Sequence, residues 1–209
     1  MPRINTDTRQ KLIDTTRDLI WQSSYGSVSV DDICDTAGVK KGSFYHYFPS
    51  KVALAIETMS EVSKILRAEY ERIFSSANSA MENLDQFVSF TYERQARAAK
   101  KYGHVCGCPL ASLGSEMACQ EGGIREKYDE VRRVHLRYYE RLVENFTAEG
   151  ALAKDTDAKA MAEKLYSYVL GLMMVARIEN NLEPMKKDLK SGLLQMLGLN
   201  EKDRKPQAA

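Results

Sequence analysis

The chain has 209 residues, and its 44% hydrophobic content suffices to bury the core of one domain or of two small ones. Thirty basic and 29 acidic side chains leave a formal net charge of +1, so no overall positive field attracts nucleic acid and any DNA contact has to be local. No apolar run reaches the roughly 18 residues that cross a bilayer, the N-terminus lacks the pattern of a secretory signal, and four cysteines do not suggest a disulfide framework, so we expect a cytoplasmic protein.

The first predicted element is a helix over about residues 8–23, which Thr6 or Asp7 can cap. Its apolar stripe consists of Leu12, Ile13, Leu19 and Ile20. The arm before it contains Arg3, which is able to reach a minor groove, although a disordered terminus is the alternative. We expect Trp21, near the end of the helix, to pack in the core rather than to stack on a ligand.

Two short helices joined by a tight turn are predicted over residues 29–48. Ser29 is placed to cap the first helix, which ends at Gly38 because a left-handed turn costs glycine no Cβ clash. The second helix runs from Lys40 to Tyr47, and its inward stripe is Phe44, Tyr47 and Phe48. Such a pair is a helix-turn-helix, whose second helix enters the major groove of DNA.

The outward face of the second helix carries aromatic, hydroxyl and cationic groups. Three lysines, at positions 40, 41 and 51, are the only charged residues between Asp35 and Glu57, so this surface is locally positive and attracts phosphates. Free amides at the start of the next helix favour phosphate as well, beside Lys51. The DNA-binding candidates are Lys40, Lys41, Gly42, Ser43, Tyr45, His46 and Lys51.

The stretch at residues 38–48, GVKKGSFYHYF, followed by Lys51, resembles the signature of the TetR family of bacterial one-component transcriptional regulators. The resemblance covers about the first fifty residues closely, and the remainder in length and helical content. Cys34 stands where the family usually has alanine, and His46-Tyr47 replaces the commoner Tyr-His order. The resemblance implies an all-α protein, with a three-helix helix-turn-helix DNA-binding domain at residues 1–50 and a helical effector-binding and dimerisation domain at residues 51–209.

Six more helices follow the reading helix in the predicted order. Pro49 blocks continuation of the reading helix and Ser50 can cap the next one, which should run from Lys51 to about Ser75 and serve either as a mechanical link or as a structural spacer. The others are expected at about residues 81–101, 109–117, 124–148, 156–180 and 184–199. The tail at residues 201–209 is expected to fray.

The helix at residues 156–180, which Asp155 or Thr156 can cap, is apolar over more than half of its circumference. A helix of this kind is buried from two directions. With the apolar residues of the last helix, the second direction is predicted to be a copy of the same surface, which gives a two-fold homodimer. Two reading helices would then lie about 34 Å apart on a near-palindromic site. A closed monomeric bundle is the alternative.

Aromatic and methionine side chains of the C-terminal region suit a pocket for an apolar small molecule, although they are equally typical of any helical core. The family resemblance implies an effector cavity between these helices, and the effector itself stays unnamed. The candidate lining residues are Phe90, Met117, Tyr138, Tyr166 and Met173. His135, among three arginines, is expected on a solvated helix face.

Cys106 and Cys108 are candidate sensor thiols. Cys108 precedes Pro109 at a helix start, where free amides lower the pKa of a thiol. The segment at residues 107–110, GCPL, resembles a Gly-Cys-Leu segment of a TetR subgroup whose cysteine there senses electrophiles, although the proline departs from it. A small buried thiol that fills a tight helix start is the alternative. A metal site at His104, Cys106 and Cys108, with or without Cys119, would lack the CxxC pairs of structural zinc, so we expect no metal.

These observations predict a DNA-binding transcriptional regulator, a repressor that a small-molecule effector or a cysteine modification releases from a palindromic operator. A thiol-dependent enzyme is one alternative, but His104 with Cys106 or Cys108 lacks a third partner, and no phosphate loop, GxSxG or HExxH motif is present. A helical adaptor without DNA binding is another, but it does not explain the lysines around the aromatic face at residues 45–48. We expect neither catalysis nor a cofactor.

Overall fold

The computed structural model describes the backbone of residues 3–200 and the side chains from Asp7 to Asn200. Over this range the chain has nine α-helices and no strand, which confirms the all-α fold. None of the described helices is both long and apolar enough to span a membrane. The expectations for the Arg3 side chain and for the tail at residues 201–209 fall outside the described residues.

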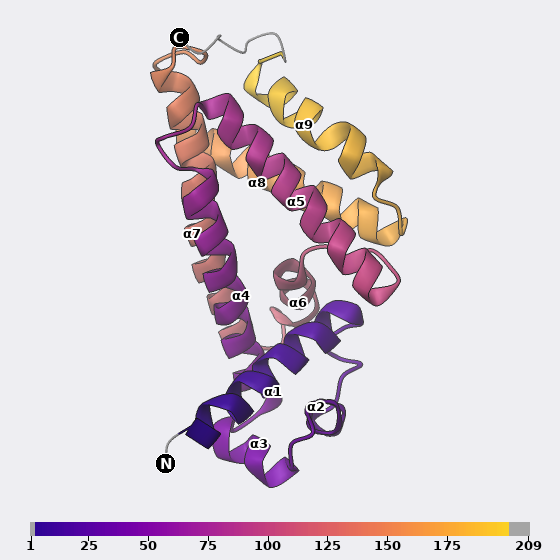
Figure 1. Ribbon diagram of the computed structural model, residues 1–209. Coiled ribbons are helices and arrows are strands. Elements are labelled where there is room, and N and C mark those ends of the chain that lie inside the picture. Colours follow the sequence, from indigo (N-terminus) through magenta and orange to yellow (C-terminus); the bar gives the residue numbers. More distant parts are fainter. Residues whose placement is uncertain (1–2, 201–209) are drawn as a thin grey trace. The chain divides into compact units, whose positions relative to one another are not determined.

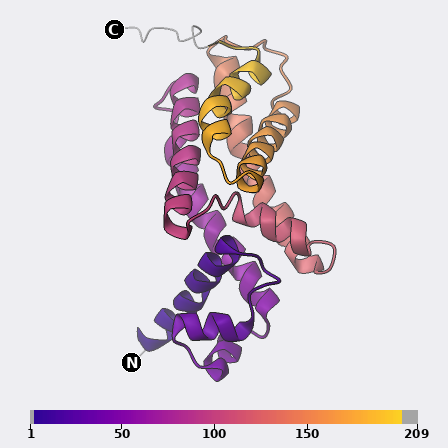
Figure 2. The ribbon, with the colours of Figure 1, turned by 90° about the vertical axis from the view of Figure 1, so that its right-hand side faces the viewer.

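The chain folds into two compact units, which Figures 1 and 2 show from two sides. The N-terminal unit comprises residues 1–66 and 108–132, and the C-terminal unit comprises residues 67–107 and 133–209. Helices α4 (Lys51–Ile73) and α7 (Gly122–Ala148) each contribute residues to both units. The division of DNA-binding and effector-binding functions at residue 50 stays a prediction.

The N-terminal unit is built on α1 (Arg3–Gln22), α2 (Val30–Ala37), α3 (Lys41–Tyr47), the first part of α4, α6 (Pro109–Met117) and the start of α7. Ser29 caps α2 as predicted, in a reciprocal capping box with Asp32, and Gly38 ends it with φ +64°. Side chains from α1, α2, α3 and α4 share one apolar core: Leu12, Ile13, Val28, Ile33, Cys34, Phe44, Phe48 and Leu54. This core holds the helix-turn-helix together.

The C-terminal unit contains the end of α4, α5 (Ala80–Tyr102), most of α7, α8 (Ala158–Ile178) and α9 (Glu183–Leu197). Helices α8 and α9 lie side by side, and α5 packs against α9 (Figures 1 and 2). Tyr70 lies at the centre of an aromatic cluster, since its ring centroid is 5.3–6.0 Å from those of five neighbours. These neighbours are Phe74, Phe87, Phe90, His135 and Tyr138.

Two sequence-based expectations in this unit are wrong. Asp157, rather than Asp155 or Thr156, caps α8, because its carboxylate accepts the N–H of Ala160 at 3.0 Å. His135 is 95% buried instead of solvated, with only 5% of its surface exposed. It shares a helical stripe with buried residues one turn before and after it, and this spacing, rather than its arginine neighbours in sequence, decides which way it faces.

Candidate nucleic-acid interface

Helix α3 is anchored by two phenylalanines and presents its opposite face to solvent. Phe44 is fully buried and Phe48 is 4% exposed, with ring centroids 6.3 Å apart. The helix ends where Pro49 follows Phe48, whose N–H donates to the carbonyl of Phe44 at 2.9 Å. Because the two anchors lie four residues apart, they take one side of the helix. Tyr47 packs partly against the same core, whereas Tyr45 and His46 point away from it.

Six of the seven DNA-binding candidates lie together on this face or at the start of the helix. Tyr45 is 52% exposed, and its ring packs edge-on against Phe44 at 5.1 Å between centroids. No atom comes within 4 Å of a Cβ built on Gly42, so the backbone is open to close approach there. The remaining members are Lys40, Lys41 and His46, which are exposed, and Ser43, which is half-buried. This surface combines amines, a phenol and a hydroxyl, the groups that contact phosphates and base edges.

Lys41 is joined to the preceding helix. Its ammonium lies 2.8 Å from the Oδ1 atom of Asp31 on α2, and this hydrogen bond and charge raise the pKa of the lysine. Both side chains are exposed, so water screens the pair and phosphate is able to compete for the lysine. The ion pair therefore holds the amine near the start of α3 and leaves Lys41 available to bind a phosphate.

Lys51, the seventh candidate, has different surroundings. Its ammonium donates to the carbonyls of Tyr25 at 2.9 Å and Val28 at 2.8 Å, and it lies 3.9 Å from the centroid of the Tyr25 ring. Burial lowers its pKa. Two of its three protons thus bind the loop between α1 and α2, and its contact with phosphate stays a prediction.

Glu116 on α6 contacts the same loop and was not among the candidates from sequence. Its Oε2 atom accepts the N–H of Tyr25 at 2.9 Å, and its Oε1 atom accepts the N–H of Gly26 at 2.6 Å. The partners are about ninety positions apart in the chain. No local spacing signals a contact of this range, although α6 itself was predicted with its observed bounds, Pro109–Met117.

The effector-binding candidates are divided between the two units. Met117 lies at the end of α6 in the N-terminal unit, and the other four lie in the C-terminal unit. Tyr138 is buried beside Tyr70 and donates to Glu71 at 2.8 Å, whereas Tyr166 packs edge-on against Tyr139 at 5.8 Å. Met173 lies 3.4 Å from the side-chain nitrogen of Gln95. Their role in binding an effector stays a prediction.

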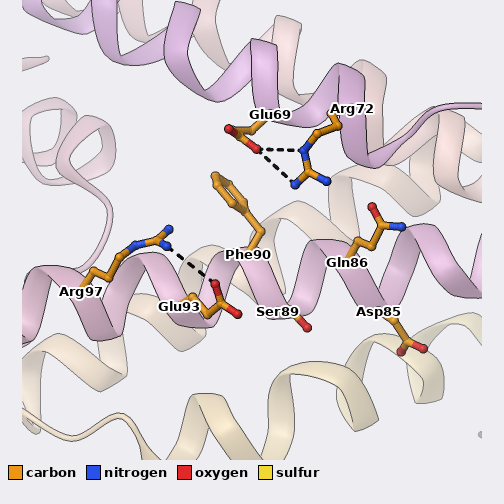
Figure 3. A pocket seen from close by; sticks show the side chains of 8 residues that line it. All are labelled: Glu69, Arg72, Asp85, Gln86, Ser89, Phe90, Glu93 and Arg97. Atoms are coloured by element: carbon orange, nitrogen blue, oxygen red, sulfur yellow. Dashed lines mark hydrogen bonds and ion pairs between the residues drawn. The ribbon is translucent and has the colours of Figure 1, made fainter.

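Phe90, the remaining candidate, lies in a groove of about 400 Å³ between α4 and α5 (Figure 3). The figure shows its ring pointing from α5 toward the Glu69–Arg72 pair on α4. The groove is lined by Glu69, Arg72, Asp85, Gln86, Ser89, Phe90, Glu93 and Arg97. Its two arginines are paired with carboxylates on their own helices, so the groove is charged but nearly balanced in sign.

The two candidate thiols differ in environment. Cys106 is fully buried in the C-terminal unit, where burial raises its pKa and so disfavours the reactive thiolate. Cys108 is half-buried at the N-cap of α6, and its carbonyl accepts the hydroxyl of Ser112 at 2.9 Å. Between them, Gly107 is held by Gln95, whose side-chain amide pairs with its N–H at 3.1 Å and its carbonyl at 3.0 Å. Within the described part of the chain, no three His, Cys, Asp or Glu side chains are grouped to hold a metal ion.

Helix α8 presents apolar side chains to solvent on the face that does not pack in the core. Ala162, Leu165, Val169 and Ala176 are buried. Ile178 is 76% exposed and Val175 is 43% exposed, and Gly171 lies in the open one turn earlier. An exposed apolar stripe of this kind is typical of a surface that a partner covers.

Two family models match the chain. The first, described as bacterial regulatory proteins of the tetR family, matches residues 12–58, and the second, described as a tetracyclin repressor-like C-terminal domain, matches residues 80–191. Together they include α2, α3, α5 and α8.

Two similar proteins are named as transcriptional regulators. HTH-type transcriptional repressor NemR of Escherichia coli K12 is 26% identical over 183 residues, covering 88% of this chain and 90% of that protein. Transcriptional regulator AcuR of Cereibacter sphaeroides is 28% identical over 177 residues, covering 84% of this chain and 79% of that protein. Among solved structures, a TetR-family regulator from Agrobacterium tumefaciens has a TM-score of 0.81 at 22% identity, covering 91% of this chain and 98% of that one.

Proposed function

Since the chain belongs to the TetR family and is a DNA-binding transcriptional regulator, we propose that it is a repressor, which binds a near-palindromic operator as a homodimer and leaves it when a small molecule or a thiol modification acts on it. The similar proteins are regulators rather than enzymes, which favours this reading over a thiol-dependent catalyst. A regulator of this kind works where the DNA is, which in a bacterium is the cytoplasm.

One observation supports the DNA-binding role most directly: Tyr45 is half exposed, although Phe44 before it and Phe48 after it are buried. Contact between an aromatic ring and water is unfavourable, and the ring is more stable when a ligand covers it. We assign Lys41, Ser43 and Tyr45 to base edges and phosphates, with Lys40 and His46 on phosphate and Gly42 allowing close approach. Lys51 is assigned to phosphate through the one proton that the loop does not use.

Tyr45→Ala tests this assignment. Its affinity for duplexes selected by the wild type from a random library should fall about tenfold or more, which is the range of one lost base-edge contact. Ile65→Ala is a matched control, because Ile65 is also 52% exposed but lies on α4. Gel shifts at two salt concentrations measure both, since DNA binding through phosphates weakens steeply with salt. Unchanged affinity in Tyr45→Ala would remove this residue from the interface.

The dimer is proposed to form through the exposed stripe of α8, with the adjoining residues of α9. Ile178→Glu places a charge at its most exposed apolar position and should shift the equilibrium toward the monomer, because burying an unpaired carboxylate in an interface is costly. Sedimentation velocity over a range of concentrations measures the shift. Glu126→Lys, at an exposed polar position of α7, is the control. A dimer as strong in Ile178→Glu as in wild type would contradict this surface.

We propose that release of the protein from its operator starts with a change in the C-terminal unit or at the thiols. Phe90, Tyr138, Tyr166 and Met173 are the proposed effector contacts there, with Met117 as a fifth on α6. Cys108 is the better candidate for modification, because it is partly accessible and burial raises the pKa of the Cys106 thiol. Effector and operator would then oppose each other's binding by linkage.

A further inference from the structure

The loop between α1 and α2 is held through its backbone from two directions within the N-terminal unit. The two oxygens of Glu116 accept the successive N–H groups of Tyr25 and Gly26, and the ammonium of Lys51 binds the carbonyls of Tyr25 and Val28. A carboxylate that accepts two amides makes charge-assisted hydrogen bonds, which are about twice as strong as neutral ones. Helix α6 thus supplies the acceptor for two N–H groups of the loop, and α4 supplies the donor to two of its carbonyls.

A side chain at position 26 would disturb this contact rather than the backbone. A Cβ at Gly26 would lie 2.8 Å from the Oε1 atom of Glu116, closer than such atoms can approach. The φ angle of Gly26 lies outside the left-handed region, so an alanine could adopt the same backbone. Alanine at this position would therefore push the carboxylate away and leave the rest of the loop intact.

The loop controls where the reading pair begins. Val28 is buried in the core that it shares with Phe44, and Ser29, the next residue, caps α2. Tyr25 is 5% exposed, so its ring is also part of the packed interior. A shift of residues 25–28 would move the start of α2, and α3 follows α2 after the short turn at Gly38.

Helix α6 connects this contact to the C-terminal unit through the chain itself. Gly107, the last residue of that segment of the C-terminal unit, has both backbone groups paired with Gln95, which also lies 3.4 Å from the sulfur of Met173. α6 begins two residues later, and Glu116 is its eighth residue. A helix of nine residues is about 14 Å long.

We propose that Glu116 is the residue through which α6 positions the reading head: it holds the α1–α2 loop by the amides of Tyr25 and Gly26, and a change at Gly107 reaches α3 through it. The inference rests on the proposed function, because it explains how release is conveyed to the DNA-binding face. It assigns Glu116 a positioning role and no contact with DNA.

Amide hydrogen exchange in the free protein tests the contact without DNA. In Glu116→Ala, exchange at Tyr25 and Gly26 should become at least about tenfold faster, because each amide loses a charged acceptor. Glu126→Ala, an exposed glutamate of α7 in the same unit, should leave both amides unchanged. The same exchange rates in Glu116→Ala and wild type would overturn the inference.

Affinity for the library-selected duplexes tests the positioning role. Glu116→Ala and Gly26→Ala should each weaken binding about tenfold, and the double variant should be no weaker than Glu116→Ala, since both changes remove one contact. Glu116→Gln keeps one acceptor oxygen and should recover part of the loss. Faster exchange with unchanged DNA affinity would make Glu116 a local support only and would overturn the inference, as would fully additive losses.

The two proposals fail in different ways. Wild-type protein that binds no duplex in a salt-dependent manner would overturn the proposed function, and the inference with it. Wild-type protein that binds the selected duplexes, with Glu116→Ala binding them equally well, would overturn the inference alone.

Discussion

Two groups of aromatic rings in this protein have opposite surroundings. On α3, Tyr45 is 52% exposed and stands beside two exposed lysines. In the C-terminal unit, the Tyr70 cluster is mostly buried: Tyr70 and His135 are 8% and 5% exposed, while Phe90 at its edge reaches the groove between α4 and α5. Tyr45 on α3 is accessible to a ligand, whereas most rings of the Tyr70 cluster are buried in the core. Ring content alone therefore does not identify a binding site, whereas exposure shows which rings are free to contact a ligand.

The largest effect is expected from the residue beneath the exposed face. Phe44→Ala removes a fully buried ring from the N-terminal core and should lower the free energy of unfolding by about 3–5 kcal/mol, in contrast to Tyr45→Ala, which should change it little. Urea unfolding followed by circular dichroism measures both. An equal decrease in the free energy of unfolding for the two variants would contradict the distinction between Phe44, which supports the fold, and Tyr45, which is free to bind.

Acid should weaken the closed cluster through His135. Burial, and after it the charge of Arg94, lowers its pKa to about 4 from 6.5, so between these values the unfolded chain binds a proton that the folded chain excludes. The contribution of neutral His135 to the free energy of unfolding is thus fully present above about pH 6.5. It is lost as the pH drops toward 4, by up to about 3 kcal/mol.

The measurement is urea unfolding of the wild type and of His135→Phe at pH 7 and pH 4.5. The phenylalanine variant should lose less stability between the two, because its ring does not titrate. His46→Gln, at an exposed histidine, is the control and should follow the wild type. A wild type and His135→Phe with the same pH dependence would contradict a neutral buried histidine.

The smallest effect is expected at the edge of the exposed face. Lys41→Ala removes one proposed phosphate contact and should reduce the dependence of log affinity on log salt by about 1, with similar loss on all duplex sequences. The Asp31 pair is exposed, so stability should hardly change. Salt titrations of the wild type and the variant on two unrelated duplexes measure this slope. A loss confined to one sequence would assign Lys41 to a base edge instead.

Local interactions determined much of the fold from sequence alone. The bounds of α2 and α6 were predicted to the residue, and α3 within one residue, because Ser29, Gly38, Pro49 and Pro109 act on their immediate neighbours. The buried and exposed faces of α3 follow from the spacing of Phe44 and Phe48 in the same way. Caps, turns and helical periodicity depend on residues within about four positions of each other, so a single sequence contains them.

Only the tertiary structure decided which way certain polar side chains face. Lys51 turns to carbonyls more than twenty positions away, and Glu116 turns to amides about ninety positions away. Each of these contacts joins elements that are distant in the chain, and their geometry depends on how whole helices pack. Spacing along the sequence carries no record of such a contact, which is why the reading face was predictable and the groups that hold its supporting loop were not.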